Sequence, residues 1–252
     1  MILVFGGTTE GKIIATLLEE KRIPYIYSTK TNIDFIEGKY GNFRYGPFSV
    51  DSLEDFCFKQ NIKAIVNGSH PFAIELHKTI FTVSSKHDLP VLRFERKEIL
   101  KTVNPLVQYF DSYEVAMDYL LNNPISSLLA LTGVQTISLL KNYWEKHTTY
   151  FRILPRDPSL AIAASSGIPL ENIIQEFPNG NIDSIKKIIL NKNIKGIITK
   201  ESGDSGFLTQ KIEAALQSGI PILIIKKPPV PSTFIKVFSR EELSEQIDNL
   251  VL

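Results

Sequence analysis

MILVFGGTTEGKIIATLLEE, residues 1–20, is the stretch of sequence that decides the fold. Residues 1–5 form an apolar run of the kind that is buried on both faces of a sheet. Residues 10–21 follow with apolar side chains at helical spacing: Ile13, Ile14, Leu17 and Leu18. Between them stands the turn Gly6-Gly7-Thr8-Thr9-Glu10-Gly11. A strand, a glycine-rich turn and a helix in this order predict the first unit of a parallel α/β sheet.

The same alternation continues along the chain. Further strands are predicted at 24–28, 42–45, 64–67 and 90–94, with helices at 52–60 and 74–85. Beyond residue 107, strands are predicted at 128–131, 149–154, 173–176, 196–199 and 221–225, with helices at 135–144, 159–165, 182–190, 207–218 and 240–252. Such alternation is typical of parallel sheets that helices cover on both faces.

Residues 96–107 interrupt the pattern with mixed charge, Pro105 and no clear period. We therefore expect a dinucleotide-binding domain over 1–98, a linker over 99–107 and a second domain over 108–252. A chain of 252 residues is long enough for two modest domains. The predicted fold class is α/β: two Rossmann-like, doubly wound parallel-sheet domains, with the active site in the cleft between them.

The composition of the chain bears on whether it binds nucleic acid, enters a membrane or holds a metal. Lys and Arg total 28 and Asp and Glu total 27, a balance that argues against a nucleic-acid binder. No apolar run approaches the roughly 20 residues that span a bilayer, and the N-terminal run lacks the flanks of a signal peptide, so a cytoplasmic protein is expected. The single cysteine, Cys57, lies in an apolar run and is interpreted as a buried structural thiol. No metal site is predicted, and the oligomeric state stays open.

The glycine-rich turn is the first candidate site. A phosphate needs backbone N–H donors and close approach, and a glycine-rich turn that opens a helix offers both. The spacing is GGxxxG, which differs from both GxGxxG and the Walker A loop. We predict that Gly6, Gly7, Thr8, Thr9 and Glu10 contact a dinucleotide pyrophosphate. The alternative is a tight turn that binds no ligand.

The end of the second predicted strand bears on the choice of cofactor. Dinucleotide-binding folds that take NAD usually carry an acid here, which holds the ribose hydroxyls. This chain has Ser28, Thr29 and Lys30 instead. Hydroxyls and a lysine suit a 2′-phosphate, so NADPH is expected, with NADH as the alternative. A solvated loop lysine is the competing interpretation.

A histidine follows the fourth predicted strand, in Asn67-Gly68-Ser69-His70-Pro71-Phe72-Ala73. Ligands of open α/β sheets bind beyond the carboxyl ends of the strands, so this segment is expected beside the glycine turn. We predict cofactor contacts from Ser69, His70 and Pro71, and proton transfer by His70 as the catalytic role. The alternative is a histidine that only caps the next helix. His77, His87 and His147 lack a comparable context.

Cationic and polar residues follow several strands of the second half. They include Arg152, Arg156, Lys200 and Ser202, with Leu131-Thr132-Gly133 after another strand. Arginine binds carboxylates through two parallel hydrogen bonds, so this set suits a substrate with several carboxylates. Ordinary surface charge is the alternative for each residue taken singly.

These motifs together resemble the precorrin-6A reductase family. The resemblance runs from Met1 to about Pro229 and rests on the ordered motifs GGTTE at 6–10, HPFA at 70–73, RFER at 93–96, LTG at 131–133, RILPR at 152–156, TKESG at 199–203 and KPP at 227–229. It implies hydride transfer from a reduced nicotinamide to a ring double bond of precorrin-6A or its cobalt form, in cobalamin biosynthesis. The substrate would be a tetrapyrrole that bears acetate and propionate groups.

Some positions depart from the family pattern. The family usually has an acid where Asn67 stands and a threonine where Ser69 stands, and it has glycine and arginine where this chain has Thr29, Lys30 and Thr31.

Two other functions are alternatives to a precorrin reductase. A short-chain oxidoreductase would need a lysine four residues after a tyrosine, which Tyr109, Tyr113 and Tyr143 lack. A non-catalytic dinucleotide sensor would bind nucleotide without turnover.

Overall fold

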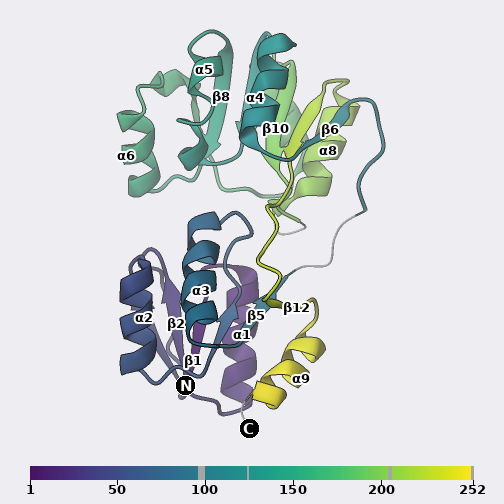
Figure 1. The fold of residues 1–252 in the computed structure, drawn as a ribbon. Helices are drawn as coiled ribbons and strands as arrows, with labels where there is room; N and C mark the ends of the chain where they lie inside the picture. The colour runs from purple at the N-terminus through teal and green to yellow at the C-terminus, as the bar shows by residue number, and fades with distance from the viewer. Residues whose placement is uncertain (96–99, 124, 204–205, 251–252) are drawn as a thin grey trace. The chain divides into compact units, whose positions relative to one another are not determined.

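The computed structural model describes residues 1–95, 100–123, 125–203 and 206–250. The chain forms two compact domains (Figure 1). The first consists of Met1–Glu98 together with Pro228–Leu252, and the second of Ile99–Lys227. Each domain is built on its own parallel sheet, and each is described by itself below.

The first domain has a sheet whose described strands run in the order β12-β5-β4-β1-β2-β3. Their bounds are β1 Ile2–Phe5, β2 Tyr25–Thr29, β3 Gly41–Tyr45, β4 Ala64–Asn67, β5 Val91–Phe94 and β12 Ile235–Val237. Neighbours pair in parallel throughout, with β1 between β2 and β4. The strand order reverses between β1 and β4, which is where ligands of doubly wound sheets bind.

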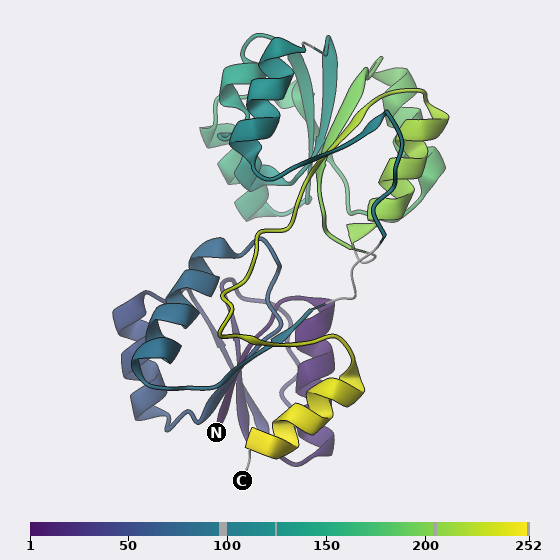
Figure 2. The same cartoon turned by 45° about the vertical axis from the view of Figure 1, so that its right-hand side comes forward.

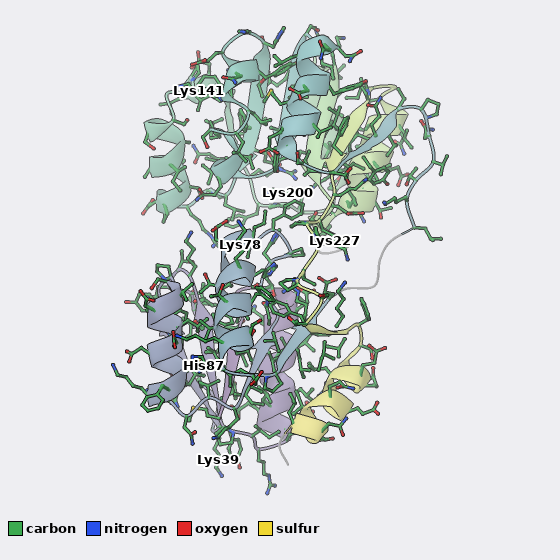
Figure 3. The ribbon with its side chains drawn as sticks, in the orientation of Figure 1. Lys39, Lys78, His87, Lys141, Lys200 and Lys227 are labelled. Atoms are coloured by element: carbon green, nitrogen blue, oxygen red, sulfur yellow. The ribbon has the colours of Figure 1, made fainter. Side chains whose placement is uncertain are left out.

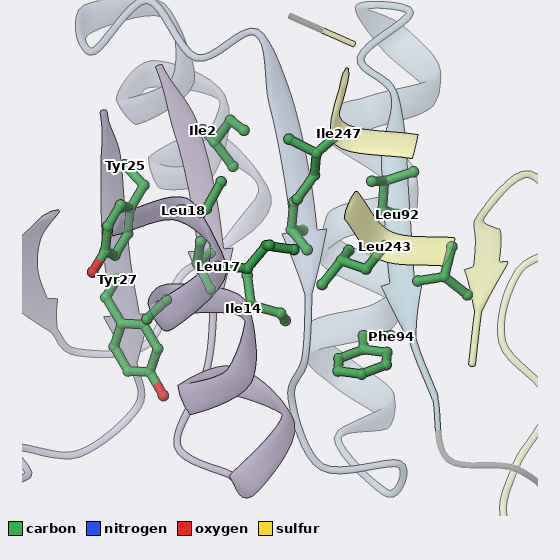
Figure 4. Packing of buried hydrophobic residues seen from close by; sticks show 14 residues of the cluster. Ile2, Ile14, Leu17, Leu18, Tyr25, Tyr27, Leu92, Phe94, Leu243 and Ile247 are labelled. Atoms are coloured by element: carbon green, nitrogen blue, oxygen red, sulfur yellow. The ribbon is translucent and has the colours of Figure 1, made fainter. Parts of the chain in front are cut away.

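Helices cover both faces of this sheet. Their bounds are α1 Thr9–Glu20, α2 Val50–Lys59, α3 Ile74–Lys86 and α9 Arg240–Leu250. On one face, Ile14 and Leu18 of α1 pack with Leu243 and Ile247 of α9 in a single cluster (Figure 4). On the other face, α2 and α3 contribute Leu53, Cys57, Ile80 and Val83. Cys57 is buried as predicted, and burial raises its pKa to about 11.

The second domain repeats this plan. Its described strands run in the order β6-β11-β10-β7-β8-β9. Their bounds are β6 Val107–Phe110, β7 Ser127–Leu131, β8 Thr148–Ile153, β9 Ile173–Gln175, β10 Gly196–Lys200 and β11 Ile222–Ile225. Counted from β7, the order 9-8-7-10-11 matches the order 3-2-1-4-5 of the first sheet, so the reversal falls between β7 and β10.

Helices lie on both sides of the second sheet (Figure 2). They are α4 Tyr113–Asn122, α5 Lys141–Trp144, α6 Asp157–Ser165, α7 Ile182–Asn191 and α8 Leu208–Gln217, with short 3₁₀ turns η1 Val134–Thr136 and η2 Leu170–Asn172. The faces of α7 and α8 are buried together against the sheet through Ile185, Ile189 and Ile212. None of the helices in the described ranges combines the length and apolar character that crossing a membrane requires.

The expected domain limits need one correction. Residues 228–252 do not belong to the second domain, because β12 pairs with β5 in the register Ile235↔Leu92. Ion pairs also join α9 to α1, between Lys21 and Asp248 at 2.7 Å and between Arg240 and Glu20. The boundary at 96–99 and the last two residues of the expected closing helix, Val251 and Leu252, lie outside the described residues.

The second half differs from expectation in its local elements as well. The expected continuous helix at 135–144 is confirmed only over its last four residues: the short α5 ends the range, and the 3₁₀ turn η1 begins it. The Thr136 hydroxyl bonds back to the Gly133 carbonyl at 2.7 Å, which competes with a regular helix. The strands β6 and β12 and helix α4 were not predicted, and β6 begins at Val107, inside the expected linker.

Candidate functional site

The glycine turn lies at the reversal point of the first sheet, directly after β1. Gly7 has a φ of +86°, a conformation that L side chains rarely adopt, and it is exposed. Its N–H donates to the Tyr27 hydroxyl at 2.9 Å. A side chain at Gly6 or Gly11 would overlap the Tyr27 side chain, so these two glycines make room for that tyrosine. Of the three glycines, Gly7 is the one placed to let a ligand approach.

Thr8 connects the two loops on either side of the reversal. It is the N-cap of α1: its hydroxyl accepts from the Gly11 N–H at 3.1 Å and donates to the Gly68 carbonyl at 2.5 Å. The predicted use of this hydroxyl as a phosphate donor therefore competes with an existing bond. The exposed Thr9 and half-buried Glu10 form the first turn of α1, where backbone N–H groups lack partners within the helix. An anion at this turn would be held by backbone groups.

The end of β2 carries the residues expected to choose the cofactor. Ser28 and Thr29 are buried, whereas Lys30 is exposed. Arg44 in β3, which was not among the predicted site residues, donates from Nη1 to Ser28 Oγ at 2.8 Å. Its guanidinium also lies 3.8 Å from the centroid of the Phe48 ring. A cation inside the predicted strand 42–45, beside the strand that ends in Ser28, was the signal that could have revealed it.

The loop after β4 rests on a buried polar network. Asn67 Oδ1 accepts from the Ser69 N–H at 3.1 Å, from Ser69 Oγ at 2.7 Å and from Arg93 Nη1 at 3.1 Å. Arg93 and Glu95 are themselves buried and approach each other to 3.4 Å. Arg96, the last residue of the motif at 93–96, lies outside the described residues. This network holds the buried Ser69 in place, while the next residue, His70, is exposed.

His70 takes a defined orientation on that loop. Its Nδ1 accepts from the Phe72 N–H at 3.1 Å, so the neutral ring carries its proton on Nε2. The His70 carbonyl also accepts from the Ala73 N–H at 2.9 Å. His70 thus supports the turn that leads into α3, and Pro71 lies half-buried in the same turn. The role of a turn-forming histidine and that of a proton donor are compatible in this geometry.

His77, which was not predicted to have a functional role, stabilises this loop. Its side chain is buried, and its Nε2 lies 3.3 Å from Ser69 Oγ. Burial and the nearby positive charge of Arg93 lower its pKa to about 4. His77 is therefore neutral at physiological pH and holds Ser69 through a hydrogen bond.

The second domain gathers three cations at the carboxyl edge of its sheet. Arg152, the residue before the last of β8, is buried and pairs with Glu176 at 3.4 Å. Lys200 ends β10 (Figure 3), and burial lowers its pKa. The third is Lys211 of α8, which was not predicted because it stands within a helical pattern. Burial, and then the charges of Arg152 and Lys200, lower its pKa.

The other two predicted substrate residues lie elsewhere on this domain. Arg156 is exposed at the N-cap of α6, with its guanidinium 5.9 Å from the centroid of the Phe177 ring. Ser202 is half-buried in the segment that follows β10. Arg152 and Lys200 are thus brought together by the fold, whereas Arg156 is held by a separate element. Within the described ranges, no three His, Cys, Asp or Glu side chains are grouped as metal ligands.

Similarity to known proteins covers the whole of this architecture. A solved structure titled CobK precorrin-6A reductase superposes with a TM-score of 0.79 over 99% of this chain and 96% of its own, at 19% identity, which shows a shared fold. The cobalt-precorrin-6A reductase of Methanocaldococcus jannaschii is 27% identical over 99% of this chain and 98% of its own length. The precorrin-6A reductase of Rhodococcus erythropolis is 25% identical over 91% of this chain and 90% of its own length.

One protein family matches nearly the full length of the chain. The family "Precorrin-6x reductase CbiJ/CobK" matches residues 1–250. This match spans both domains, including the C-terminal segment that returns to the first sheet. The chain therefore belongs to the precorrin-6x reductase CbiJ/CobK family.

Proposed function

We propose that this chain reduces one ring double bond of precorrin-6A or cobalt-precorrin-6A, using a reduced nicotinamide as the hydride donor. The observation that carries the proposal is the site at the strand reversal, where the Thr8 hydroxyl joins the glycine turn to the Gly68 loop at 2.5 Å. Membership of the reductase family supplies the reaction class. The protein contributes binding and orientation, while a bound nicotinamide would supply the hydride.

The residues of the glycine turn would hold the dinucleotide. Gly6, Gly7, Thr8, Thr9 and Glu10 form the turn and the first residues of α1, where backbone N–H groups and the helix dipole favour an anionic pyrophosphate. Ser69, His70 and Pro71 would contact the cofactor from the adjoining loop. Because Tyr27 already occupies the Gly7 N–H, the helix N-terminus is the stronger source of donors.

NADPH is the cofactor that this edge of the sheet favours over NADH. Ser28, Thr29 and Lys30 offer no carboxylate to repel a 2′-phosphate, and Arg44 adds a guanidinium beside Ser28. One charge-assisted contact contributes about 1.5–3 kcal/mol. Lys30→Ala should therefore raise the KM for NADPH roughly ten-fold while changing the KM for NADH little, as steady-state kinetics would show. A wild-type protein that strongly prefers NADH would contradict this.

The second domain would take the substrate. Arg152, Arg156, Lys200 and Ser202 offer cationic and hydroxyl groups that suit the acetate and propionate side chains of a tetrapyrrole. His70 would donate the proton that accompanies reduction, through the Nε2–H that the turn leaves oriented.

The deciding experiment is turnover by the purified protein. NADPH oxidation is followed by absorbance with precorrin-6A and, separately, cobalt-precorrin-6A as substrates. Reduction of either supports the proposal, and the ratio of the two rates identifies the natural substrate. Protein that binds NADPH but reduces neither would instead be a dinucleotide sensor. A folded His70→Asn variant that keeps wild-type turnover would remove His70 as the proton donor.

A further inference from the structure

Lys211 is a buried cation that the proposed function does not use. It lies on α8 with only 5% of its surface exposed, between Leu208 and Ile212, which pack in the core. Its Nζ donates to Thr199 Oγ1 at 3.2 Å, while Thr199 Oγ1 donates to the Leu131 carbonyl at 3.3 Å. Its ammonium therefore lies next to the strand ends β7 and β10, at the reversal point of the second sheet.

The surroundings of this ammonium are unfavourable for a charge. Among residues 1–95, 100–123, 125–203 and 206–250, no carboxylate forms an ion pair with Lys211. Its electrostatic neighbours are instead cations, Arg152 from β8 and Lys200 from β10. Burial and these two charges together lower its pKa to about 7. An apolar side chain would fill the same position without the cost of burying a charge.

We propose that Lys211 is the buried end of a carboxylate-binding site that Arg152 and Lys200 complete, and that a carboxylate binding there is accompanied by uptake of a proton by Lys211. This rests on the proposed function in one respect, the polycarboxylate nature of the ligand. The step is a simple protonation: a proton from solvent adds to the Nζ lone pair as the negative charge arrives. The ligand thereby supplies Lys211 with a counter-charge that no carboxylate of the described residues provides.

Other titratable groups lie near the site and could in principle carry the proton. Glu176 pairs with Arg152 Nη1 and accepts from Ser184 Oγ at 3.0 Å, so it is a carboxylate in direct contact with the cluster. On α7, which packs against α8, Lys186 donates to Gln217 at 3.0 Å, whereas Asp183 and Lys187 are exposed. Glu201 accepts from the Lys227 N–H at 2.9 Å. Of these groups Lys211 is the one that combines burial with two cationic neighbours.

The test uses citrate, a tricarboxylate, as the probe of the full-length protein. Isothermal titration calorimetry in HEPES and in Tris at the same pH gives the protons exchanged on binding, because the two buffers differ in ionisation enthalpy. A group with a pKa near 7 that becomes fully protonated would take up about half a proton at pH 7 and about nine-tenths at pH 8. The proposal is overturned if citrate binding takes up no proton, or if the number of protons taken up does not rise from pH 7 to pH 8.

Matched variants assign the proton. Lys211→Met should weaken citrate binding at least ten-fold and abolish the uptake, while raising the melting temperature, because a buried charge is removed. Lys187→Met, an exposed lysine of the same domain, should behave as the wild type in all three respects. Uptake that survives in Lys211→Met but disappears in Glu176→Gln would assign the proton to Glu176 and refute the proposal. If Lys211→Met does not fold, Lys211→Gln and the wild-type pH dependence still decide.

Failure of this inference can be told apart from failure of the proposed function. Lys211-dependent uptake on citrate binding, without turnover of either precorrin, would support the carboxylate site and refute the reductase. Turnover without Lys211-dependent uptake would do the reverse.

Discussion

Gly7 and Gly133 are the residues at which a backbone angle can be separated from a binding role. Both have a φ near +85°, one after β1 and the other after β7, and an added Cβ would meet no close neighbour at either position. An alanine would therefore be strained at either site by its positive φ, by about 1–3 kcal/mol, and not by a steric clash. The two residues form a matched pair in the two domains.

Gly7→Ala should lose stability and nucleotide affinity together, whereas Gly133→Ala should lose stability alone. The reason is that only Gly7 belongs to the turn proposed to hold the pyrophosphate. Thermal unfolding and fluorescence titration with NADPH measure the two properties. Equal loss of NADPH affinity in both variants would show that strain, not contact, controls binding.

His77 links stability to acid pH. Its pKa lies near 4 in the folded protein, against about 6.5 in an unfolded chain. Because the folded state resists protonation, this residue contributes stability that is fully present above pH 6.5 and is lost as the pH falls towards 4. The shift corresponds to about 3 kcal/mol.

His77→Gln should flatten this part of the profile. Glutamine keeps a polar group near Ser69 but does not titrate in this range, so the variant should lose less stability between pH 7 and pH 4 than the wild type. Urea unfolding at several pH values measures the difference. An unchanged slope would mean that the buried network of Arg93 and Glu95, not His77, carries the acid sensitivity.

At the scale of elements, α9 belongs to the first domain although the whole second domain separates it in sequence from the other helices of that domain. Leu243 is completely buried among residues of α1 and the first sheet. Leu243→Ala should therefore destabilise the first domain by about 2–5 kcal/mol. Leu190→Ala, where the side chain is 81% exposed on α7, is the control and should have little effect.

The nucleotide identifies which domain has been affected. Added NADPH should raise the melting transition of the first domain, and Leu243→Ala should lower that same transition. If the variant instead lowers a transition that does not respond to NADPH, then α9 stabilises the second domain in solution.

At the scale of the whole molecule, charge is balanced overall but gathered locally. The net charge is +1, yet Arg152, Lys200 and Lys211 share one sheet edge, and Arg156 adds an exposed cation on α6. Binding by exposed charges weakens as salt is added, since the Debye length falls to about 8 Å at physiological ionic strength. A polycarboxylate substrate should therefore bind in a salt-dependent manner.

Arg156→Gln should reduce affinity for the precorrin about ten-fold at low salt and flatten the salt dependence, with NADPH affinity unchanged. Titrations at several salt concentrations measure both effects. Lys187→Gln removes the same charge from an exposed position on α7 and serves as the control. Equal effects of the two variants would mean that Arg156 acts only through net charge.

Local sequence was sufficient for much of this protein. The apolar runs at 2–5, 64–67 and 196–199 predicted parallel strands, and the glycine turn predicted the candidate site at the end of the first strand. Burial on both faces requires apolar residues in sequence, and a positive φ favours glycine, so both can be read from adjacent residues. The ordered motifs also identified the reductase family. These features depend on short stretches of chain, which is why they can be predicted without a structure.

Tertiary structure decided the features that depend on distant partners. The strands β6 and β12 are short edge strands without an apolar run, and only pairing with β11 and β5 makes them strands. That pairing returns residues 228–252 to the first domain. Likewise, Arg44 meets Ser28, His77 meets Ser69, and Lys211 joins Arg152 and Lys200 only once the sheets are formed. Hydrogen bonding and desolvation act between neighbours in space, so no local pattern could predict which of these side chains would meet or how their pKa values would shift.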